Sequence, residues 1–275
     1  THNSCTKDFL MTTHQPFFSV ITASLNNAAT LTDALNSIRA QGFRDLEHIV
    51  IDGGSQDDTL RILESYKDTY NLRWISEPDE GISDALNKGV RLSAGKYLLV
   101  IQADDFLISD DVLTHAYNLL SDEQFDIMSF PVYVVYQNGT KVLYEPRKYT
   151  NIRYHFKNIF PHQGTFVHKR VYDAVGLFRT ELHISMDYDF FYRCMNAKRS
   201  FCKGNIPIAV WRAEGISHTQ KYTRILYEMR VQDLNEDSKL WRVAQRAFRL
   251  LYVPYRKLHS IVNRLRSRYY GMPIN

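Results

Sequence analysis

The stretch KYLLVIQADDF, residues Lys96–Phe106, joins an apolar run to two adjacent carboxylates. The run from Tyr97 to Ile101 is aromatic, aliphatic and β-branched, which is typical of a buried strand. Asp104 and Asp105 follow after Gln102 and Ala103. Two like charges side by side repel each other unless one is protonated or a cation lies near them. The stretch therefore predicts a buried strand that ends at a polar site.

Strand-like and helical segments alternate on the N-terminal side of this stretch. Apolar residues in four β-rich runs are separated by segments with apolar residues at helical spacing. Such alternation is typical of βαβ crossovers, so we predict an α/β fold with three α/β/α layers and a mostly parallel sheet. The expected strands are Phe17–Thr22, Leu46–Asp52, Leu72–Ser76 and Lys96–Ile101, and the expected helices are Leu31–Gly42, Thr59–Tyr66 and Ile82–Leu92.

The second half is less regular and ends in helices. The β-rich runs Ile127–Tyr136 and Lys141–Tyr144 flank Asn138-Gly139, which predicts a hairpin and antiparallel strands. After residue 220 helical spacing returns and continues to Val253. We expect a break at Pro254, because proline interrupts a helix, followed by a further helix.

Composition limits the class of protein. Of the 275 residues, 44% are hydrophobic, which is enough for a sizeable core, and no apolar run is long enough to span a membrane. The polar start does not resemble a secretory signal, so we expect a protein on the cytosolic side. The three cysteines lack zinc-site spacing, and we expect reduced thiols, with Cys194 and Cys202 in the core.

Basic residues are concentrated at the C-terminus. Residues 241–275 contain eight Lys or Arg and no acid, which leaves 26 basic residues against 30 acidic ones in the rest of the chain. The C-terminal region therefore has a different electrostatic role from the body.

Polar residues follow each predicted strand of the N-terminal half. In open parallel sheets ligands bind outside the carboxyl ends of the strands. Small and acidic residues in this place suit a ligand with hydrogen-bonding groups and a hard cation. There is no G-x-G-x-x-G and no P-loop motif, which argues against classical dinucleotide and NTPase sites. The segments concerned are Thr22–Asn26, Asp52–Asp58, Glu77–Gly81 and Gln102–Asp105.

Each of these acids has a structural alternative. We favour ligand contact for Asp52, which ends a strand, and helix capping for Asp57 and Asp58, which precede the helix at Thr59. For Asp104 and Asp105 the alternatives are solvated loop acids and a site for Mg²⁺ or Mn²⁺ that binds a diphosphate. Four acidic strand ends together favour the metal and diphosphate site.

Six motifs follow one another along the chain: PFFSVITASLNN, HIVIDGGSQDDT, SEPDEGISDALNKGV, AGKYLLVIQADD, FPHQGTFVHKRVYDAVGLFRTEL and ISMDYDFFYRC. In this order they resemble the motifs of family 2 glycosyltransferases with the GT-A fold, and the resemblance covers about residues 16–217. It implies a Rossmann-like GT-A domain over 16–218, with a nucleotide-sugar half (16–106) and an acceptor half (107–218). This domain would lie between a flexible segment 1–15 and a basic amphipathic helical region 219–275.

The resemblance also implies the reaction and the donor site. Such enzymes transfer a sugar with inversion from a nucleotide-sugar, here expected to be a UDP-sugar, with Mg²⁺ or Mn²⁺. Asp104 and Asp105 match the metal motif, and His218 is a candidate for a late metal ligand. Gln102 replaces the usual first residue of that motif, which favours Asp104 as the direct ligand. The residues expected at the donor are Thr22, Ser24, Asn26, Asp52, Asp79, Asp84, Lys88 and Asp104.

In the acceptor half, Asp187 matches the position of the family's catalytic base. An inverting transfer needs one carboxylate to take the proton of the acceptor hydroxyl and needs no nucleophile. We favour helix capping for Asp189. His162 and Gln163 match a His-Gln pair that either lies near the acceptor or diphosphate or is a structural hydrogen-bonding pair.

The basic C-terminal region allows two interpretations in an enzyme. A basic amphipathic helix with aromatic residues can lie on an anionic membrane, on the cytoplasmic face of the inner membrane where a lipid-linked acceptor of polysaccharide assembly would be. Alternatively, it packs on the body. Two other classes of function remain open: a GT-A module that binds nucleotide-sugar without transfer, and nucleic-acid binding, against which the net negative body argues.

Overall fold

The fold is built on a large sheet whose strand order is β10-β6-β9-β4-β1-β2-β3. In this computed structural model the described residues are 15–122, 124–147, 152–213 and 221–270, without the side chains of 221–222, 253 and 256–270. The strands of the large sheet are β1 (Phe18–Ser24), β2 (Leu46–Asp52), β3 (Leu72–Ser76), β4 (Tyr97–Val100), β6 (Ile127–Ser129), β9 (Thr165–His168) and β10 (Phe201–Lys203).

Most of these strands run parallel. β1 pairs in parallel with β2 and β4, β2 with β3, and β6 with β10. Only β9 runs antiparallel to its neighbours β4 and β6. The predicted mostly parallel sheet is confirmed, and the carboxyl ends of β1, β2, β3 and β4 lie along one edge.

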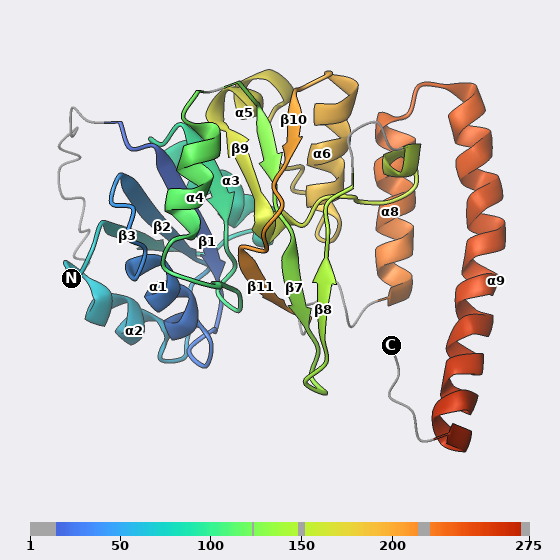
Figure 1. The fold of residues 1–275 in the computed structure, drawn as a ribbon, viewed down its shortest axis with the longest axis horizontal. Coiled ribbons are helices and arrows are strands. Elements are labelled where there is room, and N and C mark those ends of the chain that lie inside the picture. The colour runs from blue at the N-terminus through green and yellow to red at the C-terminus, as the bar shows by residue number, and fades with distance from the viewer. Residues whose placement is uncertain (1–14, 123, 148–151, 214–220, 271–275) are drawn as a thin grey trace.

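Helices cover both faces of the sheet, which confirms the three layers (Figure 1). Tyr97 and Leu99 of β4 pack into one core cluster, whereas Leu98 and Val100 pack into the other. This alternation buries both faces of a central strand. The helices are α1 (Leu31–Arg39), α2 (Thr59–Tyr66), α3 (Ile82–Leu92), α4 (Val112–Leu120), α5 (Lys169–Val175) and α6 (Met186–Asn196).

A smaller sheet in the order β5-β11-β7-β8 lies beside the large one. The predicted hairpin at Asn138-Gly139 is confirmed, but the run expected over Ile127–Tyr136 is divided between the two sheets. The division falls at Pro131, which has no backbone N–H for a strand ladder. The strands are β5 (Phe106–Leu107), β7 (Val132–Val135), β8 (Lys141–Tyr144) and β11 (Ala209–Arg212).

Two C-terminal helices, α8 (Lys221–Asn235) and α9 (Lys239–Tyr270), lie together beyond α6, at the opposite end from β3 (Figure 1). The break predicted at Pro254 is wrong, because α9 continues through it. Proline removes the bond to the carbonyl four residues earlier, that of Leu250. Leu250 is highly exposed, so water can bind this carbonyl. Two short 3₁₀ turns, η1 (Ile152–His155) and η2 (His162–Gly164), complete the second half.

Three further expectations concern the ends and the cysteines. Cys194 is buried and Cys202 is half-buried, and both are free thiols. The predicted flexible segment 1–15 lies outside the described residues except for Gln15. Within the described ranges, no helix combines the length and the apolar character that crossing a membrane requires.

Candidate functional site

The carboxyl ends of β1, β2 and β3 form a row of polar side chains. The strand register pairs Ser24 with Asp52, and Asp52 with Ser76. The Ser24 hydroxyl is buried and has no hydrogen-bond partner among the described residues. Since buried hydroxyls normally have a partner, this one can bond to a ligand at the sheet edge.

Asp52 orders the turn that follows β2. Its Oδ2 accepts hydrogen bonds from the backbone N–H groups of Gly54 and Ser55 and from the Ser76 hydroxyl, at 2.7 to 3.1 Å. Its Oδ1 accepts from the Ser55 hydroxyl at 2.5 Å. A Cβ at Gly53 would lie 2.6 Å from Asp79 Oδ2, so any larger residue at this position would displace the Asp79 carboxylate. Asp52 is fully buried, and it shapes the site by holding the loop.

The loops after β1 and β2 are bonded to each other. Asn26 has a φ of 53°; its N–H donates to the Ser55 hydroxyl and its Oδ1 accepts from Gln56. Asp57 accepts from the N–H of Thr59 at the start of α2, and hydrogen bonding with Thr59 lowers the pKa of its carboxyl. Asp57 thus caps the helix as predicted.

Asp58, also predicted as a cap, makes no capping bond and instead pairs with Arg61 at 3.1 Å. That pair is exposed, and it contributes little to stability.

Lys88 holds the loop between β3 and α3. Its Nζ lies 2.9 Å from Glu77 and 3.2 Å from Asp84, and it donates to the Pro78 carbonyl. The hydrogen bond to Glu77 is the main cause of its raised pKa, so the amine stays charged. Asp79 accepts from the N–H of Gly81 at 2.8 Å. Asp79, Asp84 and Lys88 thus form one loop cluster, and Asp79 reaches the turn after β2.

The two carboxylates after β4 differ in environment. Asp105 is buried; its two oxygens accept from Gln163 Nε2 and from the backbone N–H of Arg212, both at 2.9 Å. Burial, and next the charge of Asp104, raise the pKa of Asp105 well above its usual value. Asp104 is half-buried. The geometry therefore favours Asp104, rather than Asp105, as the carboxylate that a ligand or cation reaches.

Thr22, which was expected to contact the donor, is buried beneath the sheet edge. It is fully buried, its hydroxyl donates to the Ile101 carbonyl at 2.6 Å, and it lies 2.9 Å from His48 Nε2. Burial lowers the pKa of His48 to about 3, so this ring is neutral. Thr22 and His48 support the strands beneath the site.

Asp187 lies in the first turn of α6, after Ser185 in the left-handed region (φ 65°). Its Oδ2 accepts from Asn158 Nδ2 at 2.7 Å and its Oδ1 from the N–H of Tyr188 at 2.8 Å. Burial raises the pKa of the Asp187 carboxyl, although these hydrogen bonds oppose the shift. An oriented carboxylate with a raised pKa suits proton abstraction.

Asp189 has a different task from the helix cap that the sequence suggested. It is fully buried and pairs with Arg179 at 2.6 Å and with Arg193 at 2.9 Å. It also accepts from Asn235 of α8 at 2.8 Å. No side-chain capping bond exists at this helix start. The preference for a structural role is retained, but the role is ion pairing with two arginines together with a hydrogen bond to α8.

The His-Gln pair supports the site from beneath. His162 is buried against the rings of Phe178 and Phe191, and burial lowers its pKa to about 4. Gln163 bonds to Asp105 as described. His218, the candidate late metal ligand, lies outside the described residues.

Comparisons with known proteins identify the family. The model of "Glycosyl transferase family 2" matches residues 19–180, more than half of the chain. The chain belongs to glycosyltransferase family 2. A similar family member is the "PGL/p-HBAD biosynthesis glycosyltransferase" of Mycobacterium bovis, 31% identical over 192 residues, covering 66% of this chain and 70% of that protein. The enzyme class, a glycosyltransferase, follows from this membership.

Solved structures share the fold of this glycosyltransferase. Residues 1–349 of Staphylococcus aureus TarS in complex with UDP-GlcNAc match 83% of this chain and 69% of that one, at 20% identity and a TM-score of 0.65. In the longer TarS structure the match spans 41% of that chain. The mannosyltransferase PcManGT of Pyrobaculum calidifontis, in complex with GDP-Man and Mn²⁺, matches 95% and 77%, at 15% identity and a TM-score of 0.66.

The acidic pair of the glycosyltransferase fits a divalent cation on chemical grounds. Two adjacent carboxylates, one of which has a pKa raised partly by the other's charge, form a pair that a cation would stabilise. Among the described residues no group of three or more His, Cys, Asp or Glu side chains could hold a metal ion. A cation such as Mg²⁺ commonly takes one or two protein carboxylates and completes its shell with phosphates and water.

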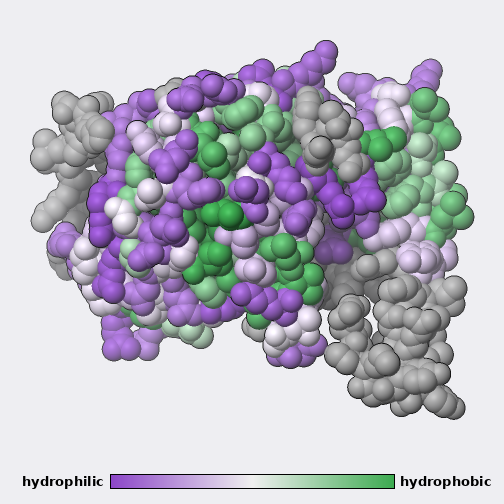
Figure 2. All heavy atoms as spheres, in the orientation of Figure 1, coloured by the Kyte–Doolittle hydropathy of each residue, from purple (hydrophilic) through white to green (hydrophobic). Residues whose placement is uncertain are grey.

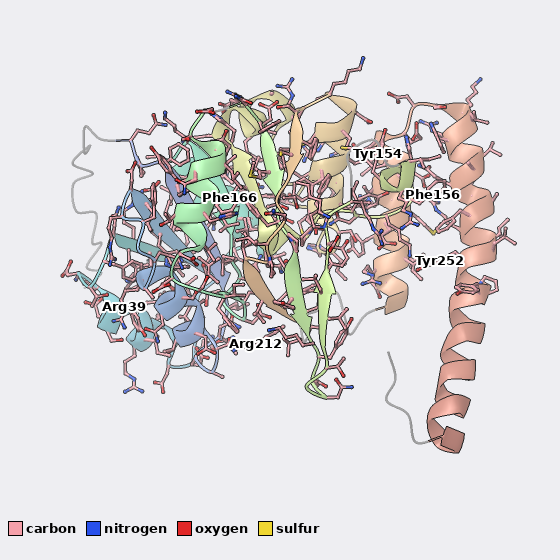
Figure 3. The ribbon with its side chains drawn as sticks, in the orientation of Figure 1. Arg39, Tyr154, Phe156, Phe166, Arg212 and Tyr252 are labelled. Carbon is pink, nitrogen blue, oxygen red and sulfur yellow. The ribbon has the colours of Figure 1, made fainter. Side chains whose placement is uncertain are left out.

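Two residues of the glycosyltransferase site were missed from the sequence. Arg212 ends β11, as Asp52 ends β2; its guanidinium donates to the Asp104 carbonyl at 2.9 Å and pairs with Asp33 at 2.5 Å (Figure 3). Asn158, the partner of Asp187, lies in a segment without periodicity. Arg212 could have been found as a charged residue at a strand end, whereas no sequence signal marked Asn158.

The different roles of Asp187 and Asp189 predict different effects of the same substitution. We expect Asp189→Asn to lower the free energy of unfolding by about 3 kcal/mol, because Arg179 and Arg193 lose their buried partner. The matched variant Asp187→Asn should change it by less than about 1 kcal/mol, because a carboxamide oxygen can still accept from Asn158. Urea unfolding of both variants measures this, and equal losses would contradict the assignment.

Proposed function

We propose that this glycosyltransferase moves a sugar from a UDP-sugar to an acceptor hydroxyl with inversion. The observation that carries the proposal is the Asp187 carboxylate, which hydrogen bonds orient and whose pKa burial raises. A base with a pKa nearer to neutrality takes a hydroxyl proton more readily than an ordinary aspartate does.

The donor would bind at the carboxyl edge of β1, β2 and β4. The unpartnered Ser24 hydroxyl, the Asp52 turn and the Asp79 loop meet there. Asp104 would hold Mg²⁺ or Mn²⁺, which screens the charge of a donor diphosphate. The neighbours support this donor class, since the TarS structure contains UDP-GlcNAc and the PcManGT structure contains GDP-Man and Mn²⁺.

The reaction would be a single displacement. The acceptor oxygen forms a bond to the anomeric carbon of the donor while the bond from that carbon to the diphosphate oxygen breaks. The proton of the acceptor hydroxyl passes to Asp187. The nucleoside diphosphate leaves with the bonding electrons, and no covalent intermediate forms on the protein.

The acceptor we propose is lipid-linked, in the assembly of a surface polysaccharide or glycolipid at the cytoplasmic face of the inner membrane. The mycobacterial relative, named for PGL/p-HBAD biosynthesis, supports a role in glycoconjugate assembly. The second support is the outer face of α9, defined below.

The inner face of α9 packs on the body. Trp241 stacks on His155 at 4.2 Å between ring centroids, and Phe248 packs on Phe156 at 4.9 Å. Gln245 is buried between them. Phe248 also stacks on Tyr252 at 4.9 Å, and Figure 3 labels Phe156 and Tyr252 in this region. These contacts confirm that the helix has a packed side, which was one of the two interpretations of the sequence.

The outer face of α9 exposes large apolar side chains among the described residues (Figure 2). Its apolar residues recur at helical spacing, and their side chains are 58% to 76% exposed. Exposed Lys239, Arg242 and Arg246 accompany them, and no acid occurs from 239 to 275. A face of this composition suits the interface of an anionic membrane. Its apolar members are Leu240, Val243, Leu250, Leu251 and Tyr255.

Two other partners fit this outer face less well. Nucleic acid is bound by cations and stacked aromatic rings, whereas the exposed stripe is mainly aliphatic. Pairing with α9 of a second copy would bring basic residues of like charge together. The charge pattern therefore favours an anionic lipid surface.

Membrane binding is tested with vesicles. We expect wild-type protein to sediment with vesicles of phosphatidylcholine and phosphatidylglycerol, but not with phosphatidylcholine alone. Replacing Leu250 and Leu251 by Gln should weaken binding by on the order of tenfold or more, because apolar side chains leave the interface.

The matched control is Leu119→Gln, a half-exposed leucine on α4, which should bind as wild type does. Binding that is unaffected by the double substitution, or a preference for DNA over vesicles, would refute membrane attachment through α9.

Catalysis is tested at Asp187. The Asp187→Asn variant should lose at least about a thousandfold in transfer, because the base is removed. It should still bind UDP with Mn²⁺ as wild type does, because Asp187 lies outside the donor site. Sugar transfer by Asp187→Asn at the wild-type rate would instead favour a non-catalytic role for Asp187. If this variant also kept full function in cells, the protein would better fit a module that binds nucleotide-sugar without transfer.

A further inference from the structure

The segment from η1 to Phe160 pairs with no strand. It nevertheless places Asn158 within hydrogen-bonding distance of Asp187. Three consecutive backbone carbonyls of this segment accept side-chain hydrogen bonds from three different helices. Tyr188 of α6 donates to Tyr154 O at 2.7 Å, Gln245 of α9 to His155 O at 2.9 Å, and Gln232 of α8 to Phe156 O at 2.9 Å.

A polar cluster around His155 joins α6, α9 and the link between α8 and α9. The His155 Nδ1 lies 2.8 Å from Oε2 of Glu236, the residue directly after α8, and Tyr192 of α6 donates to the same carboxylate at 2.6 Å. Gln245 of α9 lies 3.3 Å from the Tyr192 hydroxyl. Glu236, Gln245 and Gln232 are buried, so each of these bonds forms away from bulk water.

The orientation of the Asn158 amide is fixed by its own neighbours. Asn158 Oδ1 accepts from the N–H of Phe160 at 3.1 Å, which leaves the Nδ2 donor directed at Asp187 Oδ2, 2.7 Å away. An amide flip would turn an acceptor towards the carboxylate and a donor towards the N–H of Phe160. The Tyr144 hydroxyl, 3.3 Å from the Asn158 carbonyl, ties the residue to β8.

We propose that Asn158 is a positioning residue for the base Asp187, and that the C-terminal helices α8 and α9 hold it in place through the carbonyls of Phe156 and His155. This inference rests on the proposed role of Asp187 as base. Asp187 Oδ1 is occupied by the Tyr188 N–H and Oδ2 by the amide, and each carboxylate oxygen can accept a second bond. The amide therefore fixes which lone pairs remain for an acceptor hydroxyl.

Other charged and titratable groups act on the same carboxylate. The charge of Arg224 on α8 lowers the pKa of Asp187, against the larger effect of burial. Glu228 lies 3.6 Å from Arg224 on the same helix. Burial, and next the charge of Asp187, raise the pKa of Tyr144 in β8 to about 12. None of these groups is replaced in Asn158→Ala. A shift of the Asp187 pKa in that variant therefore reports the loss of the Asn158 amide.

The test is a titration of Asp187 by NMR on protein labelled with ¹³C at aspartate carboxyl carbons. The signal is assigned as the one absent from Asp187→Asn. Because a hydrogen bond to a carboxylate favours its charged form, we expect Asn158→Ala to raise the pKa of Asp187 by about one to two units. Gln245→Leu should raise it less, because it loosens the segment without removing the amide.

The matched control is Asn71→Ala, which removes an amide bonded to the Leu46 carbonyl in the other half and should leave the titration unchanged. Catalysis is followed by the release of UDP from a UDP-sugar. At acidic pH we expect kcat of Asn158→Ala to be about tenfold lower than that of wild type. The loss should recover as pH rises through the raised pKa, with KM for the donor within about twofold of wild type.

The outcomes separate this inference from the proposed function. An unchanged Asp187 titration in Asn158→Ala, or a loss of kcat that is equal at all pH values, would overturn the positioning role. If Asp187→Asn itself transfers sugar normally, the base assignment fails instead. Should Asn158→Ala not fold, Asn158→Asp keeps the shape and should raise the pKa of Asp187 further through like charge.

Discussion

The buried carboxylate of Asp105 is the interaction that joins the two halves of the molecule. It lies between the central strand β4 and the start of β5, and it accepts hydrogen bonds from Gln163 of η2 and from the backbone of Arg212 in β11. A carboxylate without water needs such donors, and those donors come from segments 58 and 107 residues away in sequence. Asp105 thereby fixes the small sheet beside the large one and leaves Asp104 as the more accessible carboxylate. The two neighbouring carboxylates therefore differ in role: Asp105 stabilises the fold, and Asp104 is the one that a ligand can reach.

The C-terminal helices belong to the same architecture. α8 and α9 bond to the carbonyls of the segment that carries Asn158, and Asn158 bonds to Asp187. One face of α9 therefore supports the acceptor half, while its other face presents exposed leucines and arginines. A helix used on both faces can bring an enzyme to a lipid surface and keep its base in position with the same element.

Local patterns in the sequence predicted most of the N-terminal half. The bounds of β2, α2, β3 and α3 agree with the expected ones, because amphipathic periodicity and turn residues determine them within short windows. The polar edge of the sheet followed from strand order alone. The sequence could not show that Thr22 and Asp52 would be enclosed by hydrogen bonds within the protein, because their partners come from other strands and loops. Asp189 was predicted to cap a helix, because its partner Arg179 lies on a loop that no sequence pattern links to it. Pro254 was predicted to end a helix, but α9 continues through it, because the carbonyl that loses its hydrogen bond belongs to the exposed Leu250.

The proposed donor site at Asp52 and Asp104 would bind a nucleoside diphosphate together with a divalent cation. Isothermal titration of the protein with UDP, GDP and CMP, each with Mn²⁺ and with EDTA, measures this binding, with Asp104→Asn as the paired variant. We expect UDP to bind with Mn²⁺, and binding to be lost in EDTA and at least about tenfold weaker in the variant. Binding of no nucleotide, or binding indifferent to both EDTA and the substitution, would contradict it.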